Sequence, residues 1–126
     1  MSRKTLFSII ESPSHPNLSD LYSRLNIDEV KLLSMREAIK ALKTETPDFV
    51  IAEFFFGYGN NYAGVNLSNL DVFLSSLQKY APQACVLVIA DKADKEHVAR
   101  LGKLFDINTV LLRPVSEQQL FDVLNQ

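Results

Sequence analysis

The fold is decided by residues 48–56, which read DFVIAEFFF. Apolar side chains occupy nearly every position, whereas a strand with one solvated face would alternate apolar and polar residues. This pattern predicts a central strand that is covered on both faces. Parallel sheets are covered in this way, because neighbouring parallel strands are joined by crossover helices that pack on the sheet.

Four further apolar runs with strand character lie on either side of this stretch. They are residues 4–10, 29–33, 85–90 and 109–112. In the segments that follow each run, apolar residues recur at steps of three and four, as on the buried face of a helix. The alternation of five strands with five helices predicts an α/β domain in which a parallel sheet lies between two layers of helices.

Three predicted helices begin at a residue that can accept hydrogen bonds from free backbone N–H groups. Residues 34–37 and 116–119 have the form of a capping box. Asp94 can act as an N-cap for a further helix. Asn26 is predicted to end the first helix, and the third helix is outlined by apolar residues from Leu67 to Leu77.

Composition limits the classes of protein to consider. The 126 residues, 47% of them apolar, suit one domain, residues 1–126. Thirteen basic and fifteen acidic residues form no long run of one sign, so nucleic-acid binding is not expected. The apolar run Leu6 to Ile10 is too short for a membrane span or a signal peptide. The single cysteine, Cys85, is interpreted as a small core residue and suits a reducing bacterial cytoplasm.

Polar and charged residues stand where four of the predicted strands end. All strands of a parallel sheet end at the same edge, and ligands bind in the crevice there. We therefore expect one cleft that brings together two carboxylates and a guanidinium. The residues at these strand ends are Glu11 and Ser12, Glu53, Ala90 and Asp91, and Arg113 and Pro114.

These positions make the sequence similar to the receiver domains of bacterial response regulators. In that family an acidic pair follows the first strand, an aspartate the third, a serine or threonine the fourth, and Lys-Pro the fifth. Residues 37–42 and 47–53 resemble the family's second helix and third strand, and residues 86–90 and 111–114 also fit. The resemblance covers nearly the whole chain. It implies a flavodoxin-like three-layer αβα sandwich with strand order 2-1-3-4-5.

Each matched position departs from the family in a way that removes part of the phosphotransfer chemistry that the resemblance implies. Glu53 stands at the phosphoacceptor position, with its carboxylate one methylene further out. In Glu11-Ser12 one carboxylate of the acidic pair is missing, so we expect poor Mg²⁺ binding. Ala90 lacks the hydroxyl that binds the phosphoryl group. Val110 stands where the family usually has its aromatic switch residue.

Arg113 replaces the family's lysine. Its planar guanidinium suits bidentate carboxylate binding, and an unpaired charge in a crevice is costly. We expect an ion pair between Arg113 and Glu53 or Glu11. Two interpretations of Glu53 stay open at this point: a carboxylate that ends a strand and faces water, or a permanent mimic of the phosphorylated aspartate.

The loop after the third strand, residues 57–66, contains three of the chain's four glycines but lacks the lysine of a P-loop. Phe55, Tyr58 and Tyr62 are candidates for a hydrophobic surface that contacts a partner. The alternative is that the phenylalanines complete the core while the tyrosines lie on the surface. His15 and His97 are interpreted as surface residues.

The sequence thus predicts a pseudo-receiver, a signalling module that is not an enzyme and needs no metal or cofactor. We expect it to contact a protein partner or a second copy of itself, independently of phosphorylation, and to contact neither nucleic acid nor membrane. By resemblance, the contact surface comprises the helix after Asp94, the strand 109–112 and the helix after Ser116. The alternative is a receiver that still accepts a phosphoryl group, or binds a small anion at Arg113, through unusual geometry.

Overall fold

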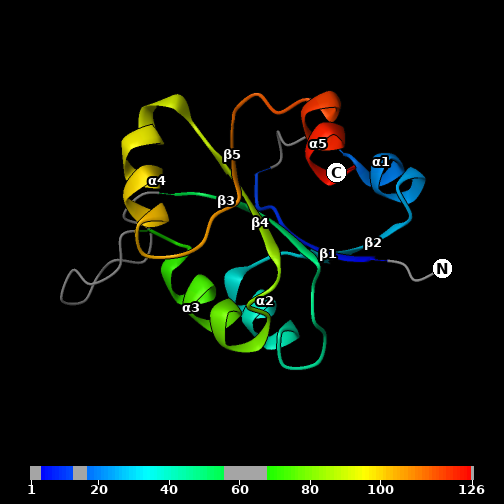
Figure 1. Ribbon diagram of the computed structural model, residues 1–126, viewed down its shortest axis with the longest axis horizontal. Coiled ribbons are helices and arrows are strands. Elements are labelled where there is room, and N and C mark those ends of the chain that lie inside the picture. The colour runs from blue at the N-terminus through cyan, green and yellow to red at the C-terminus, as the bar shows by residue number, and fades with distance from the viewer. Residues whose placement is uncertain (1–3, 13–16, 56–67, 126) are drawn as a thin grey trace.

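The computed structural model describes residues 4–12, 17–55 and 68–125. Five strands form one parallel sheet with the order β2-β1-β3-β4-β5, and helices cover both of its faces (Figure 1). The predicted three-layer α/β fold and its strand order are confirmed. The strands are β1 (Lys4–Ile9), β2 (Ile27–Leu32), β3 (Phe49–Glu53), β4 (Cys85–Ala90) and β5 (Thr109–Leu112).

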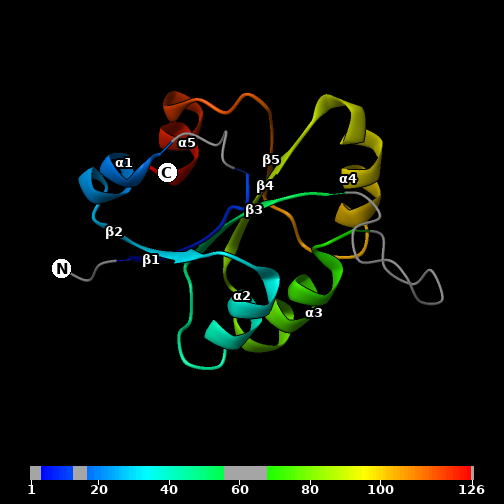
Figure 2. The same ribbon diagram turned by 180° about the vertical axis from the view of Figure 1, so that it is seen from behind.

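The helices divide between the two faces of the sheet, as the two views in Figures 1 and 2 show. Helices α1 (Ser19–Arg24) and α5 (Glu117–Leu124) pack on one face. Helices α2 (Met35–Ala41), α3 (Asp71–Tyr80) and α4 (Lys95–Gly102) pack on the other, and a short 3₁₀ turn, η1 (Lys92–Asp94), precedes α4. Within the described ranges, none of these helices has the length and apolar character needed to span a bilayer.

Strand β3 lies at the centre of the sheet and contributes to both hydrophobic clusters. Val50 and Ala52 face the cluster under α2, α3 and α4, whereas Ile51 faces the cluster under α1 and α5. All three side chains are at most 1% exposed. The unbroken apolar pattern of this stretch therefore reflects burial on both faces, with alternate side chains in different layers.

Strand β3 is shorter than predicted, because its last residue is Glu53 and not Phe56. Phe54 still donates a backbone hydrogen bond to Ile89 O, but the backbone of Phe55 pairs with Asn69. Because of this change of partner, the strand ends at Glu53, the residue at the centre of the candidate site.

The helix ends confirm some of the predicted caps and correct others. The capping box at Ser116 is complete. At α2 it is only half formed: the Ser34 hydroxyl accepts from Glu37 N, but the Glu37 carboxylate accepts from Leu33 N. Asp94 stands at the N-cap position of α4, as predicted, but it is also the last residue of η1 and its side chain makes no capping hydrogen bond.

At α1 the predicted helix end is confirmed, whereas at α3 the predicted start is corrected. Asn26 follows α1 in the left-handed conformation, with φ of 64°, which asparagine tolerates better than most residues. The third helix begins at Asp71, so Leu70, which was predicted to lie on its apolar face, is the N-cap residue instead.

Candidate functional site

The Glu53 carboxylate lies at the end of β3 and is almost completely buried, with 1% of the residue exposed. One oxygen, Oε1, accepts hydrogen bonds from the backbone N–H groups of Glu11 at 2.7 Å and Ser12 at 2.9 Å. The other, Oε2, accepts from Nη2 of Arg113 at 2.9 Å. Both oxygens are therefore engaged by donors from two other strand ends.

The Arg113 guanidinium joins three segments at this edge of the sheet. Besides Glu53, it binds Oδ1 of Asp91 through Nη1 at 3.1 Å. It also lies over the ring of Phe55, 5.9 Å from the ring centroid, which permits a cation–π interaction. The backbone N–H of Arg113 donates to Ala90 O at 2.9 Å, and this bond holds the chain after β5 against the end of β4.

The hydrogen bonds decide the charge state of Glu53. Burial opposes ionisation of the carboxyl, but the hydrogen bonds from Arg113, Ser12 and Glu11 outweigh it and hold the pKa of Glu53 below its ordinary value. Burial likewise opposes the charge of Arg113, yet its bonds to Glu53 and Asp91 raise its pKa. At neutral pH the cleft therefore contains two carboxylates and one guanidinium.

Asn69 fixes the backbone on which Glu53 is placed, and sequence reasoning missed it. Its Nδ2 donates to Glu53 O at 2.8 Å, its Oδ1 accepts from Phe55 N at 2.7 Å, and its own N–H donates to Phe55 O at 3.2 Å. The residue is only 8% exposed. The sequence did offer a signal for this role: Asn69 is a polar residue inside a segment predicted as an apolar helix face. A buried amide needs hydrogen-bond partners, so its position pointed to a structural role.

The predicted cleft forms, but its pairing differs in part from the prediction. The Arg113–Glu53 ion pair is present, whereas Glu11 contributes its backbone N–H, and the second carboxylate partner of Arg113 is Asp91. The interpretation of Glu53 as a carboxylate that faces water is wrong, because its environment is closed. Ala90 is completely buried beside the cleft.

The remaining candidates are dispersed. Val110 is 42% exposed on β5, away from these hydrogen bonds. Phe55 lies beside Arg113, while its neighbour Phe54 belongs to the core. The aromatic run therefore contributes one side chain to the candidate site and one to the core. Cys85 is only partly buried, and burial raises the pKa of its thiol, which argues against reactivity.

Three candidate residues, Tyr58, Tyr62 and His15, lie outside the described residues, as do Phe56 and Leu67 of the predicted strand and helix. The contact surface predicted to include Phe55, Tyr58 and Tyr62 therefore stays a prediction. His97 on α4 is partly buried, and its Nδ1 lies 3.5 Å from Nη1 of Arg100.

The arrangement does not suit the Mg²⁺ ion that the receiver resemblance implies. Both Glu53 oxygens accept hydrogen bonds, and the cation that neutralises them is the Arg113 guanidinium. In the part of the chain that the structure describes, no group of three or more His, Cys, Asp or Glu side chains is placed to hold a metal. Mg²⁺ requires several oxygen ligands in near-octahedral geometry, which this set does not offer.

Comparison with solved structures supports the fold assignment. A response regulator from Thermotoga maritima matches with a TM-score of 0.74 and 16% identity, over 98% of this chain and 96% of that one. A response regulator receiver domain protein from Clostridium thermocellum matches with a TM-score of 0.73 and 18% identity, over 97% and 91%. An adenylate cyclase from Rhodopirellula baltica matches with a TM-score of 0.74 and 12% identity, over 98% and 86%.

The sequence by itself gives no comparable match. No protein-family model matches it, and no curated protein matches it. At identities this low, structural likeness establishes the arrangement of the backbone and nothing about chemistry. The chain therefore has the flavodoxin-like fold of response regulator receiver domains.

Proposed function

We propose that this chain is a pseudo-receiver, a non-catalytic cytoplasmic signalling module that acts by protein–protein contact and does not depend on phosphorylation. The observation that carries the proposal is the closed pairing of Glu53. A nucleophilic carboxylate must present a free oxygen to the incoming phosphorus atom, in line with the leaving group. Both oxygens of Glu53 accept hydrogen bonds, and the residue is 1% exposed.

The same pairing argues against the alternative function, the binding of a small anion at Arg113. Two of its nitrogens already donate to carboxylates, one on Glu53 and one on Asp91. The three side chains together carry a net charge of about −1 at neutral pH. An entering anion would have to displace a carboxylate and overcome this negative charge.

Contact with a protein is supported by exposed apolar side chains near α4 and β5. Leu104, just after α4, is 63% exposed, and Val110 on β5 is 42% exposed. Single exposed apolar residues are common, so their position in the surface expected from the receiver resemblance is what supports the assignment. A second copy of the chain and a different protein are both compatible occupants.

The phosphorylation-independent part is tested by incubating the protein with Mg²⁺ and acetyl phosphate and measuring its intact mass. We expect no phosphoryl adduct, because no oxygen of Glu53 is free, while an aspartate-containing receiver treated in parallel should gain one. Amide chemical shifts recorded with Mg²⁺ and beryllium fluoride should stay unchanged around the cleft. A stoichiometric adduct, or shifts throughout the cleft, would contradict the proposal and favour the alternative receiver.

A series of variants tests which residues of this chain prevent Mg²⁺ binding at the cleft. The double variant Glu53→Asp/Ala90→Thr should restore at most a partial Mg²⁺ response, because Ser12 still lacks a carboxylate. Adding Ser12→Asp should increase the amide shifts on Mg²⁺ titration. If the unmodified chain already binds Mg²⁺ well, the argument from Ser12 is wrong.

The contact surface is tested with charge substitutions that leave the core intact. Leu104→Asp and Val110→Asp should each weaken self-association in sedimentation experiments, or the capture of partner proteins from the native cells. Val72→Asp is the matched control, since Val72 is 54% exposed but lies on α3. Equal loss in all three variants would show that the surface is placed wrongly.

A further inference from the structure

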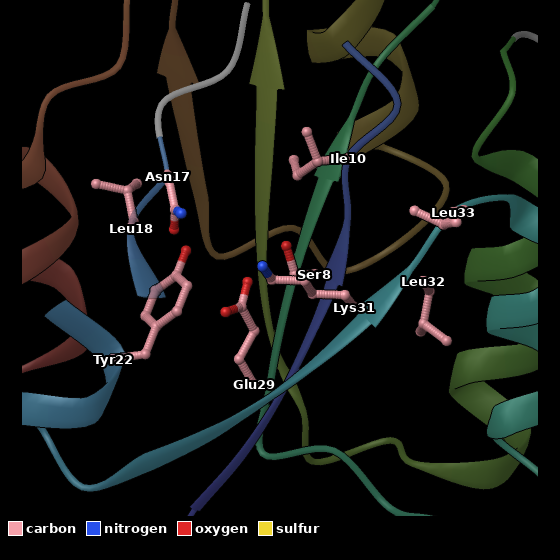
Figure 3. A pocket seen from close by; sticks show the side chains of 9 residues that line it. All are labelled: Ser8, Ile10, Asn17, Leu18, Tyr22, Glu29, Lys31, Leu32 and Leu33. Carbon is pink, nitrogen blue, oxygen red and sulfur yellow. The ribbon is translucent and has the colours of Figure 1, made fainter. Parts of the chain in front are cut away.

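A second hollow lies between α1 and the sheet edge formed by β1 and β2, and it shares no lining residue with the Glu53 cleft. Its volume is about 230 Å³. Figure 3 shows the side chains around it, with Tyr22 on one side and Glu29, Lys31 and Ser8 on the other. The lining residues are Ser8, Ile10, Asn17, Leu18, Tyr22, Glu29, Lys31, Leu32 and Leu33.

Polar side chains follow apolar ones along the face of β1 and β2 that α1 covers. Successive side chains of a strand point to opposite faces, so Ser8 lies on the same face as Leu6, and Glu29 on the same face as Ile27. Leu6 and Ile27 are buried core residues under α1 and α5. Two residues further along each strand, the side chains on this face change from apolar ones to a hydroxyl in β1 and a carboxylate in β2.

Two hydroxyls line this hollow without a hydrogen-bond partner among the residues that the structure describes. Tyr22 is 2% exposed and Ser8 is 8% exposed, yet neither side chain forms a hydrogen bond with the part of the chain that the structure describes. No fully enclosed side-chain polar atom among those residues lacks a partner, so both hydroxyl oxygens must reach the cavity. A ligand that carries hydrogen-bond acceptors can therefore reach both hydroxyls directly.

Two opposite charges also face the hollow without pairing to each other. Glu29 accepts a hydrogen bond from the Ser19 hydroxyl at 2.7 Å, but across residues 4–12, 17–55 and 68–125 it forms no ion pair, and neither does Lys31. Burial and the charge of Glu29 both raise the pKa of Tyr22 well above its ordinary value, so this phenol stays a neutral donor.

We propose that this hollow binds a small zwitterion of the α-amino acid class. The ammonium group of the ligand binds the Glu29 carboxylate, and its carboxylate accepts from Lys31 and from the buried hydroxyls. The side chain of the ligand lies against Ile10 and Leu18, which gives the site a preference for aliphatic amino acids. A cavity of about 150 Å³ already accommodates benzene, so this volume is adequate for leucine.

The first test is an amide NMR titration with leucine and two analogues that each lack one charge, 3-methylbutylamine and 4-methylpentanoate. We expect leucine to shift the resonances around Ser8, Tyr22 and Glu29, and each analogue to bind at least tenfold more weakly, because each loses a charge-assisted hydrogen bond. No shift with leucine, or equal binding of all three compounds, would overturn the proposal.

The second test uses variants of the lining residues. Glu29→Gln should weaken leucine binding at least tenfold and Tyr22→Phe about fivefold, which is the loss expected for one charged and one neutral hydrogen bond. Glu45→Gln, at an exposed glutamate outside the hollow, is the matched control and should leave binding unchanged. If Glu29→Gln and Glu45→Gln bind leucine equally well, while both retain native amide spectra, the site is assigned wrongly. Neither test involves phosphorylation, so its outcome is independent of the function proposed for the Glu53 cleft.

Discussion

The Glu53 cleft and the hollow beside α1 differ in how their polar groups are paired. In the Glu53 cleft, three hydrogen bonds satisfy one buried carboxylate, and the Arg113 guanidinium binds two acidic side chains. In the hollow beside α1, the hydroxyls of Tyr22 and Ser8 have no protein partner within the described ranges. A fully paired polar cluster contributes to stability, whereas an incompletely paired one can bind a ligand. Substitutions in the two hollows should therefore affect different measurements.

Removing the guanidinium should have the largest effect on stability. We expect Arg113→Met to lower the free energy of unfolding by about 3 kcal/mol, because it leaves the Glu53 carboxylate buried without its cation. Urea denaturation monitored by circular dichroism measures this change. Arg24→Met is the matched control: its pair with Glu117 is 62% and 54% exposed, and exposed pairs contribute at most about 1 kcal/mol. Equal losses in both variants would contradict the idea that the cleft is a closed cluster.

Asn69→Ala should have the next largest effect. The substitution removes partners from Glu53 O and Phe55 N, and each buried backbone group left without a partner costs about 1–3 kcal/mol. We expect a loss of about 2 kcal/mol by the same denaturation method. Gln78→Ala, at an exposed position on α3, should change stability by less than about 0.5 kcal/mol. A similarly small effect at Asn69 would show that the loop does not depend on this amide.

Glu53→Gln should remove about 2 kcal/mol at neutral pH and flatten the acid limb of the stability curve. The folded-state pKa of Glu53 lies below the ordinary value of 4.5. At pH values between the folded-state pKa and 4.5, the unfolded chain therefore binds more protons than the folded chain. Its contribution is fully present above about pH 4.5 and is lost as the pH falls through the folded-state value. Stability measured between pH 3 and pH 7 (about the range accessible to urea denaturation) should therefore fall less in the variant. Parallel acid limbs would show that Glu53 is not the titrating group.

Tyr22→Phe should have the smallest effect, within about 0.5 kcal/mol at neutral pH, because the hydroxyl has no hydrogen-bond partner among the described residues. The raised pKa of Tyr22 predicts a difference only in alkali: its contribution is present below the ordinary value of 10.0 and is lost at higher pH, where the unfolded phenol ionises. The variant should lose less stability than the original chain above that pH. A loss of 2 kcal/mol at neutral pH would show that this hydroxyl is already paired.

The fold could be predicted because its determinants are local and repeated. Each apolar run marks a strand, and the unbroken run 48–56 marks the central one. Glu53 and Arg113 could be placed together, since parallel strands end at one edge. The ion pair between Arg113 and Asp91 and the hydrogen bonds of Asn69 to the backbone around Glu53 could not be predicted. Both depend on the path of loop backbones.

The hollow beside α1 was also beyond sequence reasoning. Glu29 and Lys31 lie in a short strand whose polar residues are ordinary for the edge of a sheet. Only the packing of α1 against this edge shows that their side chains share a cavity with a buried tyrosine. The polar residues of the strand and the first helix were both visible in the sequence, but the packing of that helix over these residues was not.

The closed cluster around Glu53 also restricts how this sequence can evolve. Phosphotransfer chemistry of the receiver kind would require a shorter acid at position 53, a second carboxylate at position 12 and a lysine at position 113. Glu53→Asp alone pulls the carboxylate away from its three donors, and Ser12→Asp alone adds a negative charge beside an existing one. Each of these substitutions made alone is therefore expected to lower stability before any new chemistry is gained, so selection for folding disfavours it.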